Sequence, residues 1–181
     1  MAVVRQWVMA MALSSGVAVP VWASAEPQFY VGAGGSLFSR INNGNSVNDS
    51  FTETSLRPNL QLGVMRPISE RWSLGTGVEL VVEDLLDWSD STNLLMWRIG
   101  ELGYQISDRW ALSFYGGAGR FYRNNFGYGY GAGGGIYYQL GTHWLLGGEF
   151  NYVLTRTSYP NDTPYEKEHL GWGSVVFKYR F

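Results

Sequence analysis

The last residues of the chain alternate between apolar and polar positions. One row is apolar and largely aromatic, and consists of Val175, Phe177, Tyr179 and Phe181. The intervening row holds Ser174, Val176, Lys178 and Arg180. A period of two residues is typical of a β-strand with one apolar and one polar face. In a soluble sheet the apolar row would face a core, whereas in a small membrane barrel it would face lipid and the charged row would face the lumen.

Similar alternation predicts seven further strands before this one. We place the eight strands at residues 28–40, 55–67, 72–83, 93–107, 110–122, 128–140, 144–155 and 171–181. Their lengths suit tilted strands that cross a bilayer, which need about ten residues. Eight is also the strand number at which side chains can just fill a barrel interior. The pattern therefore predicts an all-β fold, an eight-stranded antiparallel up-and-down transmembrane β-barrel.

The polar rows of most strands carry charges of both signs and many glycines. We predict that they face the lumen and form a polar network of Arg57, Glu79, Glu83, Glu101, Glu149, Lys178 and Arg180. Unpaired charges in a narrow interior are costly, so we expect these groups to pair and to fill the lumen. The glycines are interpreted as space for long Arg, Lys and Glu side chains. An ion-conducting lumen and an acid–base pair are the functional alternatives.

The segment 93–107 leaves one orientation open. If Leu102 and Tyr104 face lipid, strict alternation also turns Arg98 outward. Arg98 would then extend to the membrane interface. Alternatively, a β-bulge reverses the faces of the upper half of the strand.

Three short connections repeat one chemistry. Each runs from an apolar residue through a small residue and two polar residues to a tryptophan, and the three tryptophans are Trp72, Trp110 and Trp144. Tryptophans at one level form a periplasmic aromatic girdle at a membrane interface. Longer connections at 41–54, 84–92, 123–127 and 156–169 alternate with the short ones, as in outer-membrane barrels. The alternative is a repeat in a soluble meander, with each tryptophan in a core.

The first residues resemble a targeting segment. Arg5 is followed by an apolar run from Trp7 to Val19 and by Ala23-Ser24-Ala25, the pattern of a secretory signal peptide with an A-x-A cleavage site. We expect residues 1–25 to be a signal peptide and residues 26–181 to be the outer-membrane barrel domain. An uncleaved anchor is the alternative.

Composition narrows the possible functions. The chain of 181 residues has a formal charge of −2, 24 glycines and no cysteine. It lacks the basic excess that nucleic-acid binding requires, and it has neither disulfides nor thiolate metal sites. We expect no cofactor and no metal.

Several of these stretches resemble the small eight-stranded outer-membrane β-barrel family, the OmpX, Ail and OmpA transmembrane-domain type. They are Ile106 to Gly119, Phe126 to Gly133, and the terminal Tyr179-Arg180-Phe181. The resemblance implies an integral protein of the bacterial outer membrane, with Phe181 as a signal for the barrel-assembly machinery. The family includes adhesins, structural proteins and enzymes, and the modest connections here weaken a transfer of adhesion.

An enzyme that modifies lipid A is the main alternative from another class. Lipid A enzymes of the family that this chain resembles need a histidine. Where the motif of the deacylases would fall, residues 151–153 read Asn-Tyr-Val and contain no histidine. His143 lies in a predicted periplasmic turn. His169 with Asp90 and Ser91 could form a triad, since triads are defined by geometry. We expect no catalytic residues.

The sequence thus predicts a non-enzymatic, monomeric outer-membrane protein with a plugged polar lumen. Its role would be structural or a surface interaction through extracellular loops, with a small pore as a further alternative. Its expected partners are outer-membrane lipids and lipopolysaccharide, whose phosphates suit the arginine fork. The possible lipopolysaccharide contacts are Arg120, Arg123 and Arg156.

Overall fold

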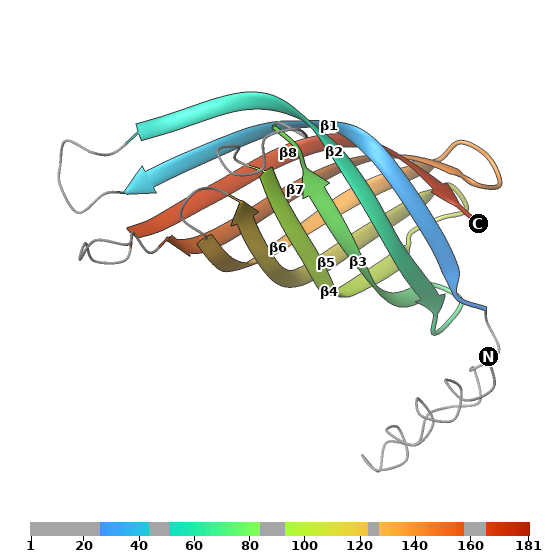
Figure 1. The fold of residues 1–181 in the computed structure, drawn as a ribbon. Helices are drawn as coiled ribbons and strands as arrows, with labels where there is room; N and C mark the ends of the chain where they lie inside the picture. Colours follow the sequence, from blue (N-terminus) through green and yellow to red (C-terminus); the bar gives the residue numbers. More distant parts are fainter. Residues whose placement is uncertain (1–25, 44–50, 84–92, 123–126, 158–165) are drawn as a thin grey trace, which may run out of the picture.

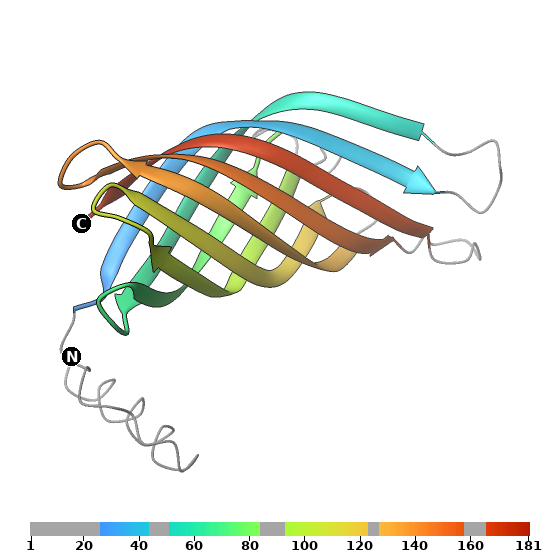
Figure 2. The ribbon, with the colours of Figure 1, turned by 180° about the vertical axis from the view of Figure 1, so that it is seen from behind.

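The computed structural model is a closed barrel in which each strand pairs antiparallel with its neighbours in sequence and β1 pairs with β8 (Figures 1 and 2). The structure describes residues 26–43, 51–83, 93–122, 127–157 and 166–181. The strands are β1 (Gln28–Asn43), β2 (Phe51–Pro67), β3 (Trp72–Val81), β4 (Asn93–Gln105), β5 (Trp110–Tyr122), β6 (Gly127–Gln139), β7 (Trp144–Thr157) and β8 (Glu166–Arg180). The predicted fold class, an all-β eight-stranded antiparallel barrel, is confirmed. The expected signal peptide lies outside the described residues.

The strand boundaries differ from the prediction mainly at the end of the barrel with the long connections. There β1 extends to Asn43 and β8 begins at Glu166 instead of residue 171. Backbone pairs such as Asn43 with Lys167 continue the ladder past the last apolar residues. Pairing of backbone groups does not require an apolar row, so hydrophobic alternation ended the predicted strands too early. In contrast, β3 ends at Val81, and the Asn93 side chain accepts a hydrogen bond from the Glu83 amide at 2.7 Å.

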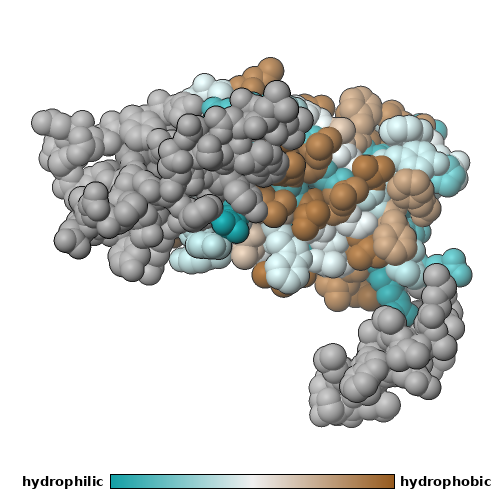
Figure 3. All heavy atoms as spheres, in the orientation of Figure 1, coloured by the Kyte–Doolittle hydropathy of each residue, from teal (hydrophilic) through white to brown (hydrophobic). Residues whose placement is uncertain are grey.

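The outer wall of the barrel is apolar around its circumference. Every strand contributes a large exposed hydrophobic side chain to it, and examples in strand order are Phe29, Leu62, Leu74, Trp97, Phe114, Ile136, Phe150 and Phe177. In the face shown in Figure 3, apolar side chains run across the part of the wall that grey atoms do not cover. Soluble monomers rarely expose continuous apolar surface on this scale. The apolar rows therefore lie outside the barrel and not in a core between two sheets. In the described part of the chain, no helix is long and apolar enough to cross a membrane.

The three short turns share one backbone geometry. In each turn the amide of the first apolar residue donates to the carbonyl of the tryptophan at 2.9 Å, from Ile68, Ile106 and Leu140. Each tryptophan packs on a tyrosine that is its cross-strand partner in the ladder. The pairs are Trp72 with Tyr104, Trp110 with Tyr138 and Trp144 with Tyr179, at ring-centroid distances of 4.6, 5.0 and 5.0 Å. The repeated closure places all three exposed tryptophans at the end of the barrel where β1 begins and β8 ends (Figure 1).

A β-bulge in β4 resolves the orientation of Arg98. The register with β5 shifts between Arg98 and Gly100, so that β4 carries one extra residue at Ile99. Arg98 and Glu101 are both buried, whereas Ile99 and Gly100 between them are exposed. The extra residue reverses which side chains face inward. Arg98 therefore points into the lumen, and the outward alternative is wrong.

Candidate functional site

Arg98 is the centre of a buried ionic cluster inside the barrel. Its Nη2 atom lies 2.6 Å from a carboxylate oxygen of Glu79 on β3 and 2.6 Å from one of Glu149 on β7. All three side chains are fully buried. Charge-assisted hydrogen bonds of this length are among the strong ones. The guanidinium thus joins opposite walls of the barrel through two carboxylates.

The carboxylate of Glu149 has several partners besides Arg98. Lys178 on β8 places its Nζ atom 2.8 Å from Glu149 Oε1, and Gln61 on β2 donates to Oε2 at 2.8 Å. The hydroxyls of Tyr137 and Tyr115 also donate to this carboxylate. Two cations, Arg98 and Lys178, balance the two anions Glu79 and Glu149. The formal charges of these four groups therefore balance, and the additional hydrogen bonds help to offset the cost of burying them.

Three further hydrogen bonds extend the cluster. Trp172 donates its indole N–H to Glu79 at 3.0 Å from the side of the barrel with the long connections. Towards the short turns, the buried carboxylate of Glu101 accepts from the hydroxyls of Tyr30 at 2.9 Å and Ser113 at 2.7 Å. Hydroxyl donors satisfy part of the lone pairs of Glu101 without a cation.

Aromatic rings cover the two cations. The Arg98 guanidinium carbon lies 3.8 Å from the centroid of the Tyr115 ring. The Lys178 Nζ atom lies 4.8 Å from the Tyr30 ring centroid and 4.4 Å from that of Tyr137. Desolvated cation–π contacts of this kind stabilise by roughly 2 kcal/mol. The tyrosines thus hold the cations in place as well as hydrogen-bonding to the carboxylates.

The inward-facing glycines make room for these tyrosines. A Cβ atom on Gly63 would lie 2.4 Å from the Tyr30 ring, and one on Gly77 would lie 2.6 Å from its hydroxyl oxygen. Tyr30 extends from β1 across both glycines to reach Glu101 on β4. A Cβ atom on Gly133 would likewise lie 2.5 Å from the Tyr115 ring. The interpretation of the glycines as space for charged chains holds at Gly135, where a Cβ atom would lie 2.9 Å from Cγ of Glu149, but at these three positions tyrosine rings take the space instead.

Beyond this cluster, on the side of the long connections, buried polar residues such as Arg57 and Asn59 accompany an apolar layer. Its buried side chains are Phe38, Val81, Leu94, Met96, Val153, Leu170 and Trp172, each 0 or 1% exposed. Phe38 stacks on Trp172 with a centroid distance of 5.9 Å. The sequence analysis expected a polar interior and did not anticipate this apolar layer. Water-sized passage through close-packed apolar side chains is unfavourable.

The residues expected in the lumen network fall into three groups. Glu79, Glu101, Glu149 and Lys178 lie buried in or beside the cluster around Arg98. Arg57 is buried elsewhere, 4.2 Å from the Phe38 ring centroid and 3.2 Å from a partly exposed Glu83. Arg180 is apart from both groups and lines a cavity near the short turns. Arg98 itself was absent from the expected network because its orientation depends on the bulge.

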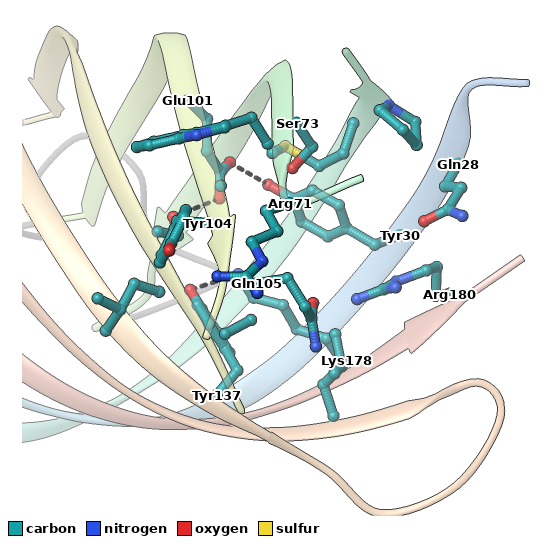
Figure 4. A pocket seen from close by; sticks show the side chains of 18 of the residues that line it. Gln28, Tyr30, Arg71, Ser73, Glu101, Tyr104, Gln105, Tyr137, Lys178 and Arg180 are labelled. Atoms are coloured by element: carbon teal, nitrogen blue, oxygen red, sulfur yellow. Dashed lines mark hydrogen bonds between the residues drawn. The ribbon is translucent and has the colours of Figure 1, made fainter. Parts of the chain in front are cut away.

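The cavity at the short-turn end has a volume of about 200 Å³. Residues of the turn between β2 and β3 line its mouth, and Glu101, Tyr137 and Lys178 lie among its walls (Figure 4). The cluster therefore separates this cavity from the apolar layer on the other side.

The candidate lipopolysaccharide contacts are only partly described. Arg120 on β5 lies 5.4 Å from the ring centroid of its neighbour Tyr128 on β6. Arg123 lies outside the described residues, and Arg156 is described only through its backbone pairing with Tyr128. Contact of these arginines with lipopolysaccharide stays a prediction.

Neither histidine belongs to the buried cluster. His143 stacks on Tyr179 at the short-turn end, and its Nδ1 atom lies 2.8 Å from the Arg180 carbonyl oxygen. His169 hydrogen-bonds to Tyr152. Asp90 and Ser91, the possible partners of His169 in a triad, lie outside the described residues. The described ranges also contain no group of His, Cys, Asp and Glu side chains arranged to hold a metal.

Comparison with known proteins places this fold among solved outer-membrane barrels. No protein-family model and no curated protein sequence matches the chain. Ail of Yersinia pestis, solved with the heparin analogue sucrose octasulfate, has 11% identity and a TM-score of 0.56, covering 86% of this chain and 99% of its own. Neisserial surface protein A has 13% identity and a TM-score of 0.51, covering 84% and 97%. The outer membrane protein AlkL, solved in lipid bilayers, has 11% identity and a TM-score of 0.51, covering 87% and 91%. The chain therefore has the fold of the small eight-stranded outer-membrane β-barrels, as the resemblance in its sequence implied.

Proposed function

We propose that this chain is an integral protein of the bacterial outer membrane that performs no chemical reaction. In this proposal its lumen is closed, and it acts through its long connections at the cell surface, in a structural role or by contact with an extracellular partner. The single observation that carries the proposal is the combination of an apolar outer wall with a neutral ionic cluster inside.

The outer wall supports insertion in a bilayer. Closure pairs every strand, so that no edge is left to expose backbone groups to lipid. The Trp–Tyr pairs at the short turns have the amphipathic character of side chains at a membrane interface. With the short turns and both termini in the periplasm, the long connections lie at the cell surface.

Two layers support a closed lumen. Arg98, Glu79 and Glu149 cross the interior with 2.6 Å contacts. Above them, buried apolar side chains such as Leu94 and Val153 fill the section towards the long connections. An ion would have to displace the cluster and then cross the apolar layer without its hydration shell. The same arrangement disfavours the alternative of a small pore.

The proposal of a non-enzyme is supported by the chemistry of the buried groups. The carboxylates of Glu79 and Glu149 are occupied by cations and N–H donors. The buried hydroxyls of Ser36 and Ser174 lie 2.8 Å from each other and contact the Asn59 amide, which is not a base. Activation of a serine requires an adjacent general base. Within the described residues the Ser36 and Ser174 hydroxyls have none, whereas Ser113 donates to the carboxylate of Glu101.

Outer-membrane lipids, lipopolysaccharide and the barrel-assembly machinery are the proposed partners of a monomeric barrel. Phe181, expected to be the assembly signal, is 70% exposed at the short-turn end. Its amide donates to the Phe29 carbonyl at 2.9 Å, which extends the β1–β8 seam to the last residue. An accessible terminal aromatic residue is consistent with recognition during assembly.

Cell fractionation tests the proposal directly. The full chain, expressed in a Gram-negative host, is expected in the outer-membrane fraction of a density gradient, and mass spectrometry is expected to find an amino terminus at Glu26. Proteolysis of intact cells should cleave within the long connections and leave the short turns intact. Recovery in the soluble periplasm, or cleavage of intact cells at the short turns, would contradict it. An altered lipid A acylation pattern on expression would support the enzyme alternative instead.

A further inference from the structure

The cavity at the short-turn end contains two arginines without an anionic partner. Arg71, in the turn between β2 and β3, and Arg180, the last residue of β8, both line it (Figure 4). Among the described residues, neither guanidinium forms a hydrogen bond or an ion pair with another group. Arg180 is half-buried, whereas Arg71 is exposed at the mouth of the cavity. An arginine that is partly withdrawn from water and lacks a counter-charge is costly unless an anion joins it.

The backbone holds both arginines in fixed positions. The Arg180 amide donates to the His143 carbonyl at 2.8 Å, and the His143 ring nitrogen lies 2.8 Å from the Arg180 carbonyl oxygen. The Arg71 carbonyl accepts from the Gln105 amide at 2.7 Å. Both guanidinium groups therefore extend from backbone that is held in place beside the cavity.

The third cation that lines the cavity, Lys178, already has an anionic partner. Lys178 is paired with Glu149 and packs on Tyr30 and Tyr137. Glu101 at the inner wall is occupied by the hydroxyls of Tyr30 and Ser113. Arg71 and Arg180 are therefore the lining cations with free donors. The arginine fork matches the oxygens of a carboxylate or a phosphate.

The rest of the lining favours an organic body behind that anionic group. Its apolar members include Met65, Leu112 and Leu145, and its aromatic members include Tyr30 and Tyr104. A water in the liquid takes about 30 Å³, so a cavity of about 200 Å³ accommodates a small solute and not just a single ion. We propose that this cavity is a binding site for a small solute that carries one carboxylate or phosphate on an apolar or aromatic body, with Arg71 and Arg180 as its anion ligands.

The proposal goes beyond the function proposed above, because it assigns a ligand to the end of the barrel opposite the long connections. It does not require the lumen to conduct. The ionic cluster forms the inner boundary of the site, so that a bound solute remains on the short-turn side.

Binding of two fluorinated probes to the purified, folded chain in a neutral detergent tests the site. The probes are 4-fluorobenzoate and 4-fluorophenyl phosphate, and 4-fluorobenzyl alcohol is the uncharged control. Fluorine NMR titration is expected to show saturable binding of at least one anionic probe, beyond that seen with empty micelles. The probe that binds distinguishes a carboxylate site from a phosphate site. Saturable binding of the alcohol with equal affinity, or no saturable binding of either anion, would overturn the proposal.

Three single variants locate the site. R71Q and R180Q are each expected to weaken binding of the anion about tenfold or more, as the loss of a hydrogen bond to a charged group does. R109Q is the matched control, because Arg109 holds the same place in the next short turn and its carbonyl accepts from the Gln139 amide at 2.8 Å. The Arg109 side chain, however, donates to the Tyr138 hydroxyl at 3.0 Å and does not line the cavity. Unchanged binding in R71Q and R180Q, or an equal loss in R109Q, would show that the two arginines are not the ligands. Gel mobility before and after heating confirms that each variant is folded.

Discussion

Replacing Glu149 by glutamine tests the buried ionic cluster most sharply. The change keeps the size of the side chain but removes the negative charge that contacts Arg98 and Lys178. Arg98 retains Glu79, whereas Lys178 loses its ion-pair partner inside the barrel. The neutral group of four charges then carries an excess positive charge. Removing one partner of a buried ion pair costs roughly 3–5 kcal/mol.

Urea unfolding in lipid vesicles measures this cost. With a dependence on denaturant of about 2 kcal/mol per molar, the midpoint should fall by roughly 1.5–2.5 M. Glu70→Gln is the control, since Glu70 is an exposed residue of a short turn, and it should change stability by less than about 0.5 kcal/mol. Adding Lys178→Met to the Glu149 variant should restore part of the loss, because the uncompensated ammonium is removed. A midpoint shift as small as that of the control, or strict additivity of the two substitutions, would refute the reasoning.

Three further perturbations test the wall and the lumen. Gly63→Ala places a Cβ atom 2.4 Å from the Tyr30 ring, so it should destabilise by about 1–3 kcal/mol, whereas Gly35→Ala, with nothing within 4 Å, should be nearly neutral in the same urea assay. Deleting Ile99 removes the extra residue of the bulge and reverses one half of β4, and we expect the heat-modifiable gel band of the folded barrel to disappear; a normally folded deletion variant would contradict the assigned register. Phe177→Arg puts a charge on the outer wall and should cost about 2–4 kcal/mol in vesicles if that wall meets the bilayer core, and an unchanged unfolding midpoint would exclude this position from lipid.

The sequence was sufficient for the fold because two of its signals repeat. Alternation marked most strands, and the tryptophan turns marked the three short hairpins; β5 has the boundaries that the pattern predicted, Trp110–Tyr122. Both signals are local, since they depend on neighbouring residues along one strand. The strand ends at the long connections were less predictable, because the backbone ladder continues through polar residues there.

The interior was less predictable because it depends on which residues meet across the lumen. In β4, Leu94 and Met96 face inward although they are apolar. Hydrophobicity therefore could not show which side chains of this strand face the lumen and which face outward. The bulge then decided the position of Arg98, and no local pattern fixes where a strand gains one residue. The sequence shows the many glycines, but their role can be assigned only when the strand register is known. Only the pairing of Tyr30 with Gly63, and of Gly63 with Gly77, shows that a tyrosine ring covers them.

The proposed function depends on an apolar outer wall around a closed lumen. A measurement of ion flow through the barrel tests the closed lumen most directly. Planar-bilayer recording of the refolded chain, with Arg98→Ala and Glu149→Ala variants beside it, measures whether the interior conducts. The account predicts no steady conductance from the unmodified chain, because the ionic cluster and the apolar layer lie in series. The variants should also be silent wherever the barrel stays folded, since the apolar layer is intact in both. Steady single-channel steps from the unmodified chain, changed in size by the two substitutions, would show that the lumen is an open pore.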